Sequence, residues 1–390
     1  MPRALERLNL TKSEENILSN KGYEISAKLG EGAYAKVYLS EYKKGDETTK
    51  LACKIVDTKK SSKTYVSKFL PRELDCLMKL KHPHIVHVHS IFRRNSKYYI
   101  FMRYAEKGDL MDYIVQFGAV SEIQTRFWAR QIALAIQYLH TLGIAHRDVK
   151  CENILITENN NVKLTDFGFS RYILDTNSKQ ILSDTYCGSL LYTSPEILQG
   201  IPYEPTKADV WALGVLIFTM LNKCVPFDNS NITILYQSQV KRRYKFRERI
   251  CGNVTMEVKK MIKHLLEPIP KKRPSINEVL EDEWYKMDSR LLKLSDFEKA
   301  ALDEAKRLDI SKMTAPTIDS VNASIPKKAS DRTLKDGNLL TGIGDKILEP
   351  THKPTVVALE QKPSAKSHRN QPTIGVTLEQ KRSAKLKNNS

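Results

Sequence analysis

The chain has 390 residues, of which 41% are hydrophobic, and a formal net charge of +18 at pH 7. This length leaves room for one large domain or two ordinary ones with tails, and the hydrophobic content supports a sizeable core. The strongest apolar run, residues 210–221, is shorter than a bilayer-spanning helix, and the N-terminus lacks the apolar segment of a secretory signal. We therefore expect an intracellular, cytoplasmic protein without a membrane-spanning segment.

The cysteines and the positive charge exclude several other classes. The six cysteines are scattered, with neither a CxxC pair nor metal-ligand spacing, which argues against a zinc site and a disulfide framework. Free thiols in a reducing compartment fit best. The charge is densest at residues 241–249, KRRYKFRER, which indicates a solvated surface or an acidic partner. No zinc-finger, basic-zipper or RNA-recognition signature accompanies it, so specific nucleic-acid binding is the minor alternative.

The order of the predicted elements indicates two lobes. Residues 23–57 have the pattern of three strands separated by glycine and charged turn residues. A helix is predicted over residues 66–80, and strands over residues 84–92 and 98–104. From residue 110 onward, apolar residues at i, i+3 and i+4 predict helices. The fold class is therefore α+β, with a β-rich N-terminal lobe and a larger helical C-terminal lobe.

Composition divides the chain into three parts. Residues 1–22 form an N-terminal extension, residues 23–287 the globular domain, and residues 288–390 a basic tail. Within the tail, the amphipathic segment 294–310 predicts a helix packed on the domain, whereas the remainder is polar and poor in aromatics, as is typical of disorder. PTVVALEQKPSAK from residue 354 is echoed by PTIGVTLEQKRSAK from residue 372. We interpret this repeat as a duplicated linear segment, used for docking or phosphorylation or without function.

A glycine loop near the N-terminus raises the question of nucleotide binding. The segment LGEGAYAKVYL, residues 29–39, nearly matches the phosphate-holding pattern G-x-G-x-x-G-x-V, but Ala35 occupies the third glycine position. Lys54 follows on the next strand but one, and Glu73 on the following helix. A lysine placed there neutralises the α- and β-phosphates of ATP, provided that an acid holds it in position.

Three further motifs follow in order. HRDVKCEN, residues 146–153, fits H-R-D-L-x-x-x-N with Val149 in the leucine position. D-F-G stands at residues 166–168, and S-P-E at residues 194–196, where A-P-E is expected. This ordered set is the general pattern of protein kinases, so the sequence predicts a protein kinase fold.

The motif residues match what phosphoryl transfer requires, which is positioning and charge stabilisation rather than covalent help. Asp148 would accept or orient the proton of the attacking hydroxyl, and Lys150 would place a positive charge beside the transferring phosphate. Asn153 and Asp166 carry the hard oxygen ligands that Mg²⁺ prefers. The expected cofactors are therefore ATP and Mg²⁺.

Longer segments resemble the testis-specific serine/threonine kinase family, within the calcium/calmodulin-dependent kinase group. They are KFLPRE, GDLMDYI, HRDVKCENILI, DTYCGSLLYTSPEILQGIPY and PFDNSNI, and the resemblance covers residues 23–287. It implies an ATP-dependent kinase that phosphorylates serine and threonine in protein substrates, acting in spermatogenesis. Members of this family resemble the chain in carrying alanine at the third glycine position, so the loop is expected to bind ATP provided that Ala35 has a negative φ.

The same resemblance implies how ATP is held. Met102 would be the gatekeeper, and backbone groups of Arg103 and Ala105 would hydrogen-bond the base. An acidic residue is usual where Arg103 stands, but a backbone contact does not depend on the side chain. The residues expected to contact ATP are Leu29, Gly30, Glu31, Gly32, Ala33, Tyr34, Ala35, Lys36, Val37, Ala52, Lys54, Met102, Arg103, Ala105 and Leu155.

Regulation is expected between the D-F-G and S-P-E motifs. Thr185 stands where related kinases are phosphorylated, and a phosphate there would pair with Arg147 and order the segment. An upstream kinase would then be a partner. Ser183 and Ser189 are lesser candidates, and an unmodified loop threonine is the alternative.

Four other residues receive roles from the resemblance. Thr193 would contact the catalytic aspartate, and Glu196 would form a buried structural ion pair with Arg273. Asp209 would anchor the backbone of the catalytic loop from a central helix.

Two acids bear on substrate choice. Asp109 and Glu152 stand where related kinases receive basic residues ahead of the target hydroxyl, which implies a preference for Arg or Lys there. The alternative is that both carboxylates are merely solvated.

For the chain as a whole, the alternative to an active kinase is a pseudokinase scaffold that binds partners without catalysis. Loss of the lysine, the catalytic aspartate or a metal ligand would favour that alternative, and all of these residues are present.

Overall fold

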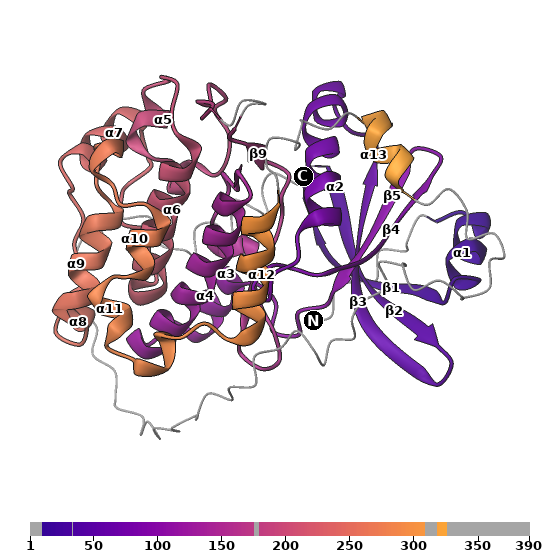
Figure 1. The fold of residues 1–390 in the computed structure, drawn as a ribbon, viewed down its shortest axis with the longest axis horizontal. Coiled ribbons are helices and arrows are strands. Elements are labelled where there is room, and N and C mark those ends of the chain that lie inside the picture. Colours follow the sequence, from indigo (N-terminus) through magenta and orange to yellow (C-terminus); the bar gives the residue numbers. More distant parts are fainter. Residues whose placement is uncertain (1–9, 33, 175–178, 309–317, 326–390) are drawn as a thin grey trace.

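The N-terminal lobe is built on a five-stranded antiparallel sheet in the order β1-β2-β3-β5-β4 (Figure 1). The computed structural model describes residues 10–32, 34–174, 179–308 and 318–325. The predicted α+β bilobal fold is confirmed: the sheet lies to one side of the molecule and most helices lie to the other. The strands are β1 Tyr23–Glu31, β2 Ala35–Lys44, β3 Glu47–Asp57, β4 Val88–Arg94 and β5 Lys97–Arg103.

The helix predicted over residues 66–80 is present and joins the sheet to the second lobe. It begins with a π-helical turn, Tyr65–Phe69, and continues as α2, Leu70–Lys79. Pro71 lies in the first turn of α2, where its missing N–H removes no helical hydrogen bond. Leu70 and Leu74 are fully buried in the apolar cluster that also contains residues of β3 and β5. This packing fixes the face of α2 that carries Glu73.

A short helix within the N-terminal extension covers part of the sheet. Helix α1, Lys12–Ser19, begins with a capping box formed by Thr11 and Glu14. Leu18 packs with Tyr23 and other sheet residues in a second apolar cluster, and Glu14 pairs with Lys97 at 3.0 Å. This helix was not predicted from the sequence.

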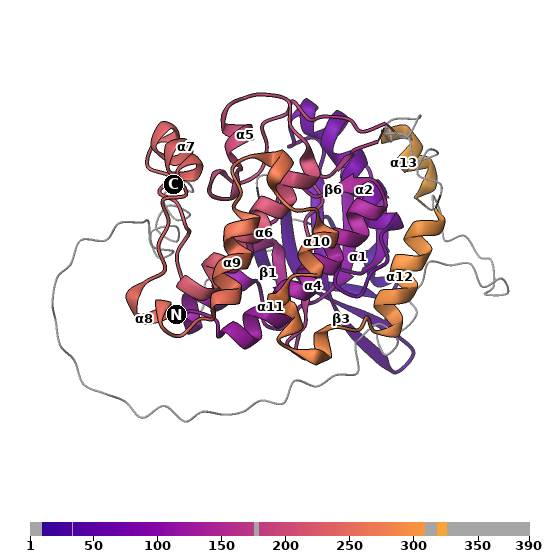
Figure 2. The same ribbon diagram turned by 60° about the vertical axis from the view of Figure 1, so that its left-hand side comes forward.

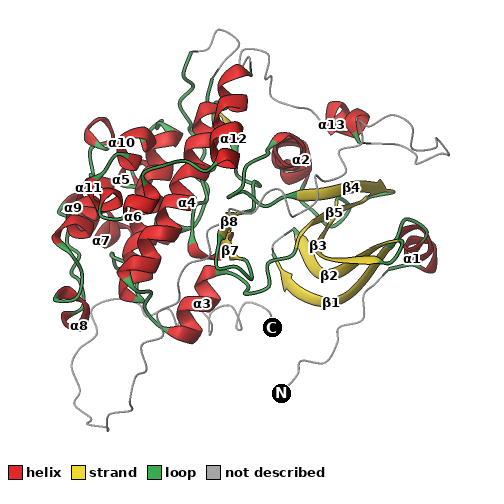
Figure 3. Ribbon diagram, turned by 60° about the horizontal axis from the view of Figure 1, so that its bottom comes forward, coloured by secondary structure: helices red, strands yellow, loops and turns green. Residues whose placement is uncertain are grey.

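The C-terminal lobe is organised around α4 and α6, with shorter helices around them (Figure 3). Residues 210–221 lie in α6, which is buried almost throughout, and no helix in the described part of the chain is long and apolar enough to cross a membrane. The helices of this lobe are α3 Leu110–Phe117, α4 Glu122–Thr141, α5 Pro195–Leu198, α6 Pro205–Asn222, α7 Ile232–Val240, α8 Glu248–Cys251, α9 Met256–Leu265, α10 Ile276–Leu280 and α11 Glu283–Lys286.

Two small antiparallel strand pairs flank the catalytic loop where the lobes meet. They are β6 Ile144–Ala145 with β9 Arg171–Tyr172, and β7 Ile154–Ile156 with β8 Val162–Leu164. These pairs fix both ends of the loop that carries Asp148 and the start of the segment that carries Asp166. The 3₁₀ turns are η2 Cys151–Asn153, η3 Leu190–Tyr192, η4 Pro270–Lys272 and η5 Ser289–Leu291.

The chain beyond the second lobe returns to the first. Helix α12, Asp296–Arg307, packs against α4, as predicted for residues 294–310. Helix α13, Ile318–Ser324, packs against α2, and the two helices follow one another along one side of the molecule (Figures 1 and 2). The expected disorder is therefore wrong for residues 318–325: Ile318, Val321 and Ile325 share one helical face, and that face is covered by the N-terminal lobe. The repeat at residues 354 and 372 lies outside the described residues.

Candidate active site

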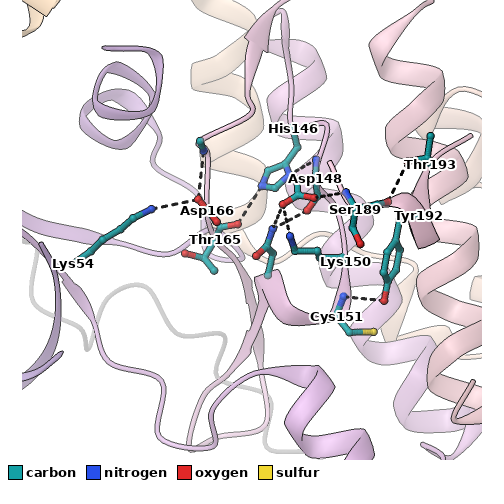
Figure 4. A network of polar contacts seen from close by, with 12 residues as sticks. Lys54, His146, Asp148, Lys150, Cys151, Thr165, Asp166, Ser189, Tyr192 and Thr193 are labelled. Atoms are coloured by element: carbon teal, nitrogen blue, oxygen red, sulfur yellow. Dashed lines mark hydrogen bonds and ion pairs between the residues drawn. The ribbon is translucent and has the colours of Figure 1, made fainter. Parts of the chain in front are cut away.

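Three predicted residues from separate motifs meet between the lobes. The Lys54 ammonium on β3 lies 2.5 Å from Glu73 Oε1 on α2 and 3.3 Å from Asp166 Oδ1 (Figure 4 shows the second contact). Glu73 is 1% exposed. Burial alone would lower the pKa of Lys54, but the charges of Asp166 and Glu73 raise it, so the lysine stays protonated. This ion pair fixes a positive charge on β3, opposite Val37 of β2.

The second oxygen of Glu73 has a partner that sequence reasoning missed. Tyr65, in the π-helical turn before α2, donates its hydroxyl to Glu73 Oε2 at 3.0 Å. The ring of Tyr34, in the glycine loop, stacks on the Tyr65 ring with centroids 4.2 Å apart and planes 13° apart. Tyr65 therefore links the loop to the ion pair. A lone aromatic ahead of the predicted helix was the only sequence signal.

The glycine loop is shaped for a close approach by phosphate. Gly30 pairs with Val37 across the hairpin, and the Gly32 N–H donates to the Ala35 carbonyl at 2.8 Å. A Cβ at Gly30 would meet no atom within 4 Å, so this side of the loop is open. Ala35 lies in β2, paired with Val56, and is not among the non-glycine residues with positive φ. The methyl group of Ala35 therefore causes no backbone strain, as expected, while Ala33 lies outside the described residues.

The strand that leads into the second lobe carries the residues expected around adenine. Met102 on β5 is 8% exposed and pairs with Ala52 on β3. The Arg103 N–H donates to the His87 carbonyl at 2.9 Å, so a base contact at Arg103 would have to use the carbonyl. The Ala105 carbonyl accepts from the Gly108 N–H at 3.3 Å. The geometry agrees with the predicted backbone contacts, which stay predictions, as does the contact by Leu155 on β7.

Asp148 is held by donors on both carboxylate oxygens. Its Oδ2 accepts from the Lys150 ammonium at 2.6 Å and from Asn153 Nδ2 at 2.9 Å, and its Oδ1 accepts from the Ser189 N–H at 3.2 Å (Figure 4). The residue is 4% exposed, and this burial raises its pKa against the opposing charge of Lys150. A carboxylate with a raised pKa and a fixed orientation suits a group that orients or accepts a hydroxyl proton.

Beneath Asp148, the loop backbone is tied to α6. The Asp209 carboxylate accepts from the His146 N–H at 2.9 Å, from the Arg147 N–H at 2.7 Å and from His140 Nε2 at 2.9 Å. Arg147 has φ of 66°, a left-handed conformation that costs free energy and that these bonds stabilise. Burial would raise the pKa of Asp209, but the hydrogen bonds and the neighbouring charges lower it. The predicted anchoring role is confirmed.

The predicted ion pair of the S-P-E motif is also present. Arg273 contacts both carboxylate oxygens of Glu196, at 2.8 and 3.0 Å, and both residues are buried. The guanidinium also lies 5.0 Å from the ring centroid of Trp211. This bidentate pair joins the end of the activation segment, the stretch from the D-F-G to the S-P-E motif, to the core of the second lobe.

The prediction for Thr193 is wrong in one respect. Its hydroxyl donates to the Ser189 carbonyl at 3.1 Å rather than to Asp148, and Ser189 in turn donates its N–H to Asp148 (Figure 4). Gly188 allows this approach, because its φ is 91° and a Cβ there would lie 2.7 Å from the Arg147 carbonyl oxygen. Thr193 therefore acts on Asp148 through one intervening residue.

Asn153 and Asp166 fit the two roles predicted for metal ligands. Asn153 Nδ2 is held by the Asp148 carbonyl at 2.8 Å and by its carboxylate, which leaves Oδ1 to face a cation. Asp166 has φ of 66° and a partly exposed carboxylate. The charge of Lys54 lowers its pKa against the effect of burial, so it is ionised. One amide oxygen and one carboxylate, with the rest supplied by phosphate and water, match the ligand preference of Mg²⁺.

Two arginines contact Ser183, two residues before Thr185. Ser183 is fully buried and accepts hydrogen bonds from Arg147 at 2.9 Å and from Arg171 at 3.1 Å, which suits a structural role better than modification. Burial and the nearby charges of Arg147 and Arg171 lower the pKa of Arg72 on α2. Thr185, two residues beyond Ser183, is only partly buried. Arg147 of the catalytic loop and Arg171 of β9 thus lie beside Ser183, and Arg72 of α2 is close enough to both for their charges to affect its pKa.

Comparison with known proteins agrees with this geometry. The protein kinase domain family matches residues 23–285, so the chain belongs to the protein kinase family. Its relatives include testis-specific serine/threonine-protein kinase 1 of Mus musculus, 40% identical over 70% of this chain and 74% of the relative. Testis-specific serine/threonine-protein kinase 3 of Mus musculus is 39% identical over 69% of this chain and 98% of the relative. CBL-interacting serine/threonine-protein kinase 7 of Arabidopsis thaliana is 33% identical over 83% of this chain and 73% of the relative. The predicted resemblance is therefore confirmed.

Proposed function

We propose that this chain transfers the γ-phosphate of ATP to serine and threonine hydroxyls of protein substrates. The observation that carries the proposal is the joint assembly of both halves of the site. Lys54 contacts Glu73 and Asp166 at the same time, while Asp148 is oriented by Lys150, Asn153 and Ser189. A scaffold without catalysis would not require this arrangement.

Each residue has a distinct part in the proposed mechanism. Lys54, held by Glu73, binds the α- and β-phosphates, and the open backbone of the glycine loop lies over them. Mg²⁺, held by Asn153 and Asp166, would neutralise phosphate charge. Asp148 orients the substrate hydroxyl and takes its proton, while Lys150 stabilises the charge on the transferring group.

We also propose that phosphorylation of Thr185 by an upstream kinase, or by a second copy of this chain, activates the enzyme. A phosphate at Thr185 would carry a charge near −2. Arg72, Arg147 and Arg171 supply the complementary charges, and Arg72 belongs to the helix that carries Glu73. The modification would therefore couple the activation segment to the position of α2.

The direct test is phosphate transfer from Mg-ATP to a serine peptide, with phosphorylation of Thr185 monitored by mass spectrometry. We expect Asp148→Asn to lower kcat on the order of 10²- to 10⁴-fold, because the proton acceptor is lost. Thr185→Ala should lower activity to the level of the unphosphorylated chain. Asp46→Asn, at an exposed turn, is the matched control and should change nothing. A Thr185-phosphorylated chain that binds ATP but transfers nothing would overturn the proposal in favour of a scaffold.

A preference for basic residues ahead of the target hydroxyl is the second part of the proposal. Asp109 caps α3 by accepting from the Asp112 N–H at 2.8 Å, and Glu152 lies in η2, within the catalytic loop. Helix α3 packs against η2, which brings the elements that carry the two carboxylates together. An arrayed peptide library in which Arg is replaced by Ala should show a fall in kcat/KM on the order of tenfold, the worth of one charge-assisted hydrogen bond. No fall at any upstream position would contradict it.

We further propose that the chain acts in the cytoplasm of male germ cells during spermatogenesis. Six free cysteines fit a reducing compartment. The names of the mouse relatives, which describe them as testis-specific, support the tissue. Immunostaining of testis sections tests both statements, and signal confined to another tissue or to an organelle lumen would contradict them.

A further inference from the structure

Helices α12 and α13 connect the two lobes outside the active site. Helix α12 packs on α4 of the C-terminal lobe, and α13 packs on α2 of the N-terminal lobe (Figures 1 and 2). Neither helix contributes a residue to phosphate transfer. Their placement against the helix that carries Glu73 nevertheless bears on the site.

Helix α12 is anchored by a buried carboxylate. Glu298 accepts from His84 Nε2 at 2.7 Å and lies 3.5 Å from Arg130 Nη1. Burial alone would raise its pKa, but these partners lower it to about 2, so the carboxylate is charged. Ala301 and Ala305 are buried against α4, where small side chains allow a close approach. The anchor therefore fixes α12 in one position.

The anchor also reaches the connection between α2 and β4. His84 belongs to that connection, and its carbonyl accepts from the Leu164 N–H of β8 at 2.8 Å. The Val86 N–H donates to the Leu164 carbonyl at 3.0 Å. Because α2 leads directly into this segment, Glu298 holds the C-terminal end of α2 to the second lobe.

Helix α13 contacts α2 through an apolar face and one polar bond. Val321 is 2% exposed and Ile325 4% exposed, and both join the cluster that contains Leu74 and Leu77 of α2. Asn322 Oδ1 accepts from the hydroxyl of Tyr98 on β5 at 2.6 Å. Helix α13 is too short to be stable alone in water, so this packing is what holds it. The bond to Tyr98 sets its orientation across α2 and β5.

We propose that α13 is a positioning element for the ion pair, which holds α2 so that Glu73 stays within hydrogen-bonding distance of Lys54. The inference rests on the proposed kinase activity. Three side chains of this segment act on α2, namely Val321, Asn322 and Ile325. They pack on the surface formed by α2 and β5. Without them, α2 spends less time in the competent position, and the apparent affinity for ATP falls in proportion to that fraction.

The experiment compares full-length variants of α13. Val321→Asp places a charge in the apolar contact, whereas Ala323→Asp places the same charge on the exposed side of the same helix. Val321→Ile is the conservative control, and Asn322→Ala is a milder variant that removes only the bond to Tyr98. KM for ATP, kcat, the thermal midpoint, and hydrogen exchange of peptides from α2 are measured for each.

We expect Val321→Asp to raise KM for ATP on the order of tenfold and to accelerate exchange in α2. Asn322→Ala should show the same changes at smaller size, and Ala323→Asp and Val321→Ile should match the wild type. A purely structural role would lower the amount of active enzyme, and hence kcat, without changing KM. An unchanged KM, unchanged exchange in α2, or equal effects of Val321→Asp and Ala323→Asp would each overturn the inference.

Failure of the kinase proposal would be recognised separately, because the wild type itself would then transfer no phosphate. The positioning role would still be tested in that case by ATP affinity in titration calorimetry and by exchange in α2. A weaker affinity and faster exchange in Val321→Asp support the inference, and equality with the wild type overturns it.

Discussion

The two halves of the active site are held in different ways. In the C-terminal lobe, the catalytic loop is held through its backbone, since two of its N–H groups donate to Asp209 of α6, and the Ser189 N–H from outside the loop donates to Asp148. In the N-terminal lobe, Lys54 and Glu73 are held by side chains from separate elements. Backbone anchoring makes the first half pre-organised, whereas the second half depends on where α2 lies. We therefore expect regulation to act on the N-terminal half.

The contacts around α2 support that reading. Tyr65 joins it to the glycine loop, its Arg72 lies near Arg147 and Arg171, and α13 packs against it. These contacts involve the glycine loop, the surroundings of Ser183 and α13. An order–disorder change in any of them would alter the Lys54–Glu73 pair while Asp148 stays in place.

The largest effect is expected from a substitution in the C-terminal half of the active site, where Asp209 anchors the catalytic loop; we call this the anchored half. Asp209→Ala would leave the His146 and Arg147 N–H groups buried without an acceptor and lose the bond to His140. We expect a loss of about 3 to 5 kcal/mol in the free energy of unfolding, together with loss of phosphate transfer. Denaturant unfolding and a peptide assay measure the two.

Asp209→Asn is the matched variant for this prediction, because it keeps one acceptor oxygen in the same place. Its loss of stability should be clearly smaller. Equal stability of Asp209→Ala and the wild type would show that the loop is not held by this residue, and the contrast between the halves would disappear.

A smaller effect is expected in the N-terminal half of the active site, which depends on the position of α2 and which we call the movable half. Glu73→Gln removes the negative partner of Lys54, but Asp166 still compensates the lysine charge at 3.3 Å. We therefore expect kcat/KM for ATP to fall about ten- to a hundredfold, the worth of a charged hydrogen bond, with a shift in unfolding midpoint well below that of Asp209→Ala. Glu15→Gln on the exposed face of α1 is the control. A stability loss as large as that of Asp209→Ala would contradict the comparison.

Sequence reasoning predicted the anchored half better than the movable one. The motif H-R-D-x-x-x-x-N carries its own geometry, because Asp148, Lys150 and Asn153 lie within a few residues of each other and meet through local bonds. The role of Tyr65 could not be predicted in this way, because a π-helical turn breaks the helical period that would have placed it toward Glu73.

The contact of α13 with α2 was missed for a different reason. Residues 318–325 contain three large apolar side chains among polar ones, and the surface on which they pack lies far away in the sequence. Composition therefore predicted disorder, while tertiary packing stabilises a helix. Thr193 shows the converse. Its place beside the catalytic loop was predicted, but its hydroxyl donates to the Ser189 carbonyl, and it is the Ser189 N–H that donates to Asp148.

The smallest and most discriminating change is Tyr65→Phe. It keeps the ring that stacks on Tyr34 and removes only the hydroxyl that donates to Glu73 Oε2. Because Lys54 still holds the other oxygen, the expected fall in kcat/KM for ATP is about three- to tenfold, the net worth of one neutral hydrogen bond. Tyr34→Phe keeps the same stacking and removes a hydroxyl at the exposed loop, so it should match the wild type. If Tyr65→Phe also matches the wild type, Glu73 is positioned by Lys54 and the packing of α2 alone, and the hydroxyl of Tyr65 does not orient the ion pair.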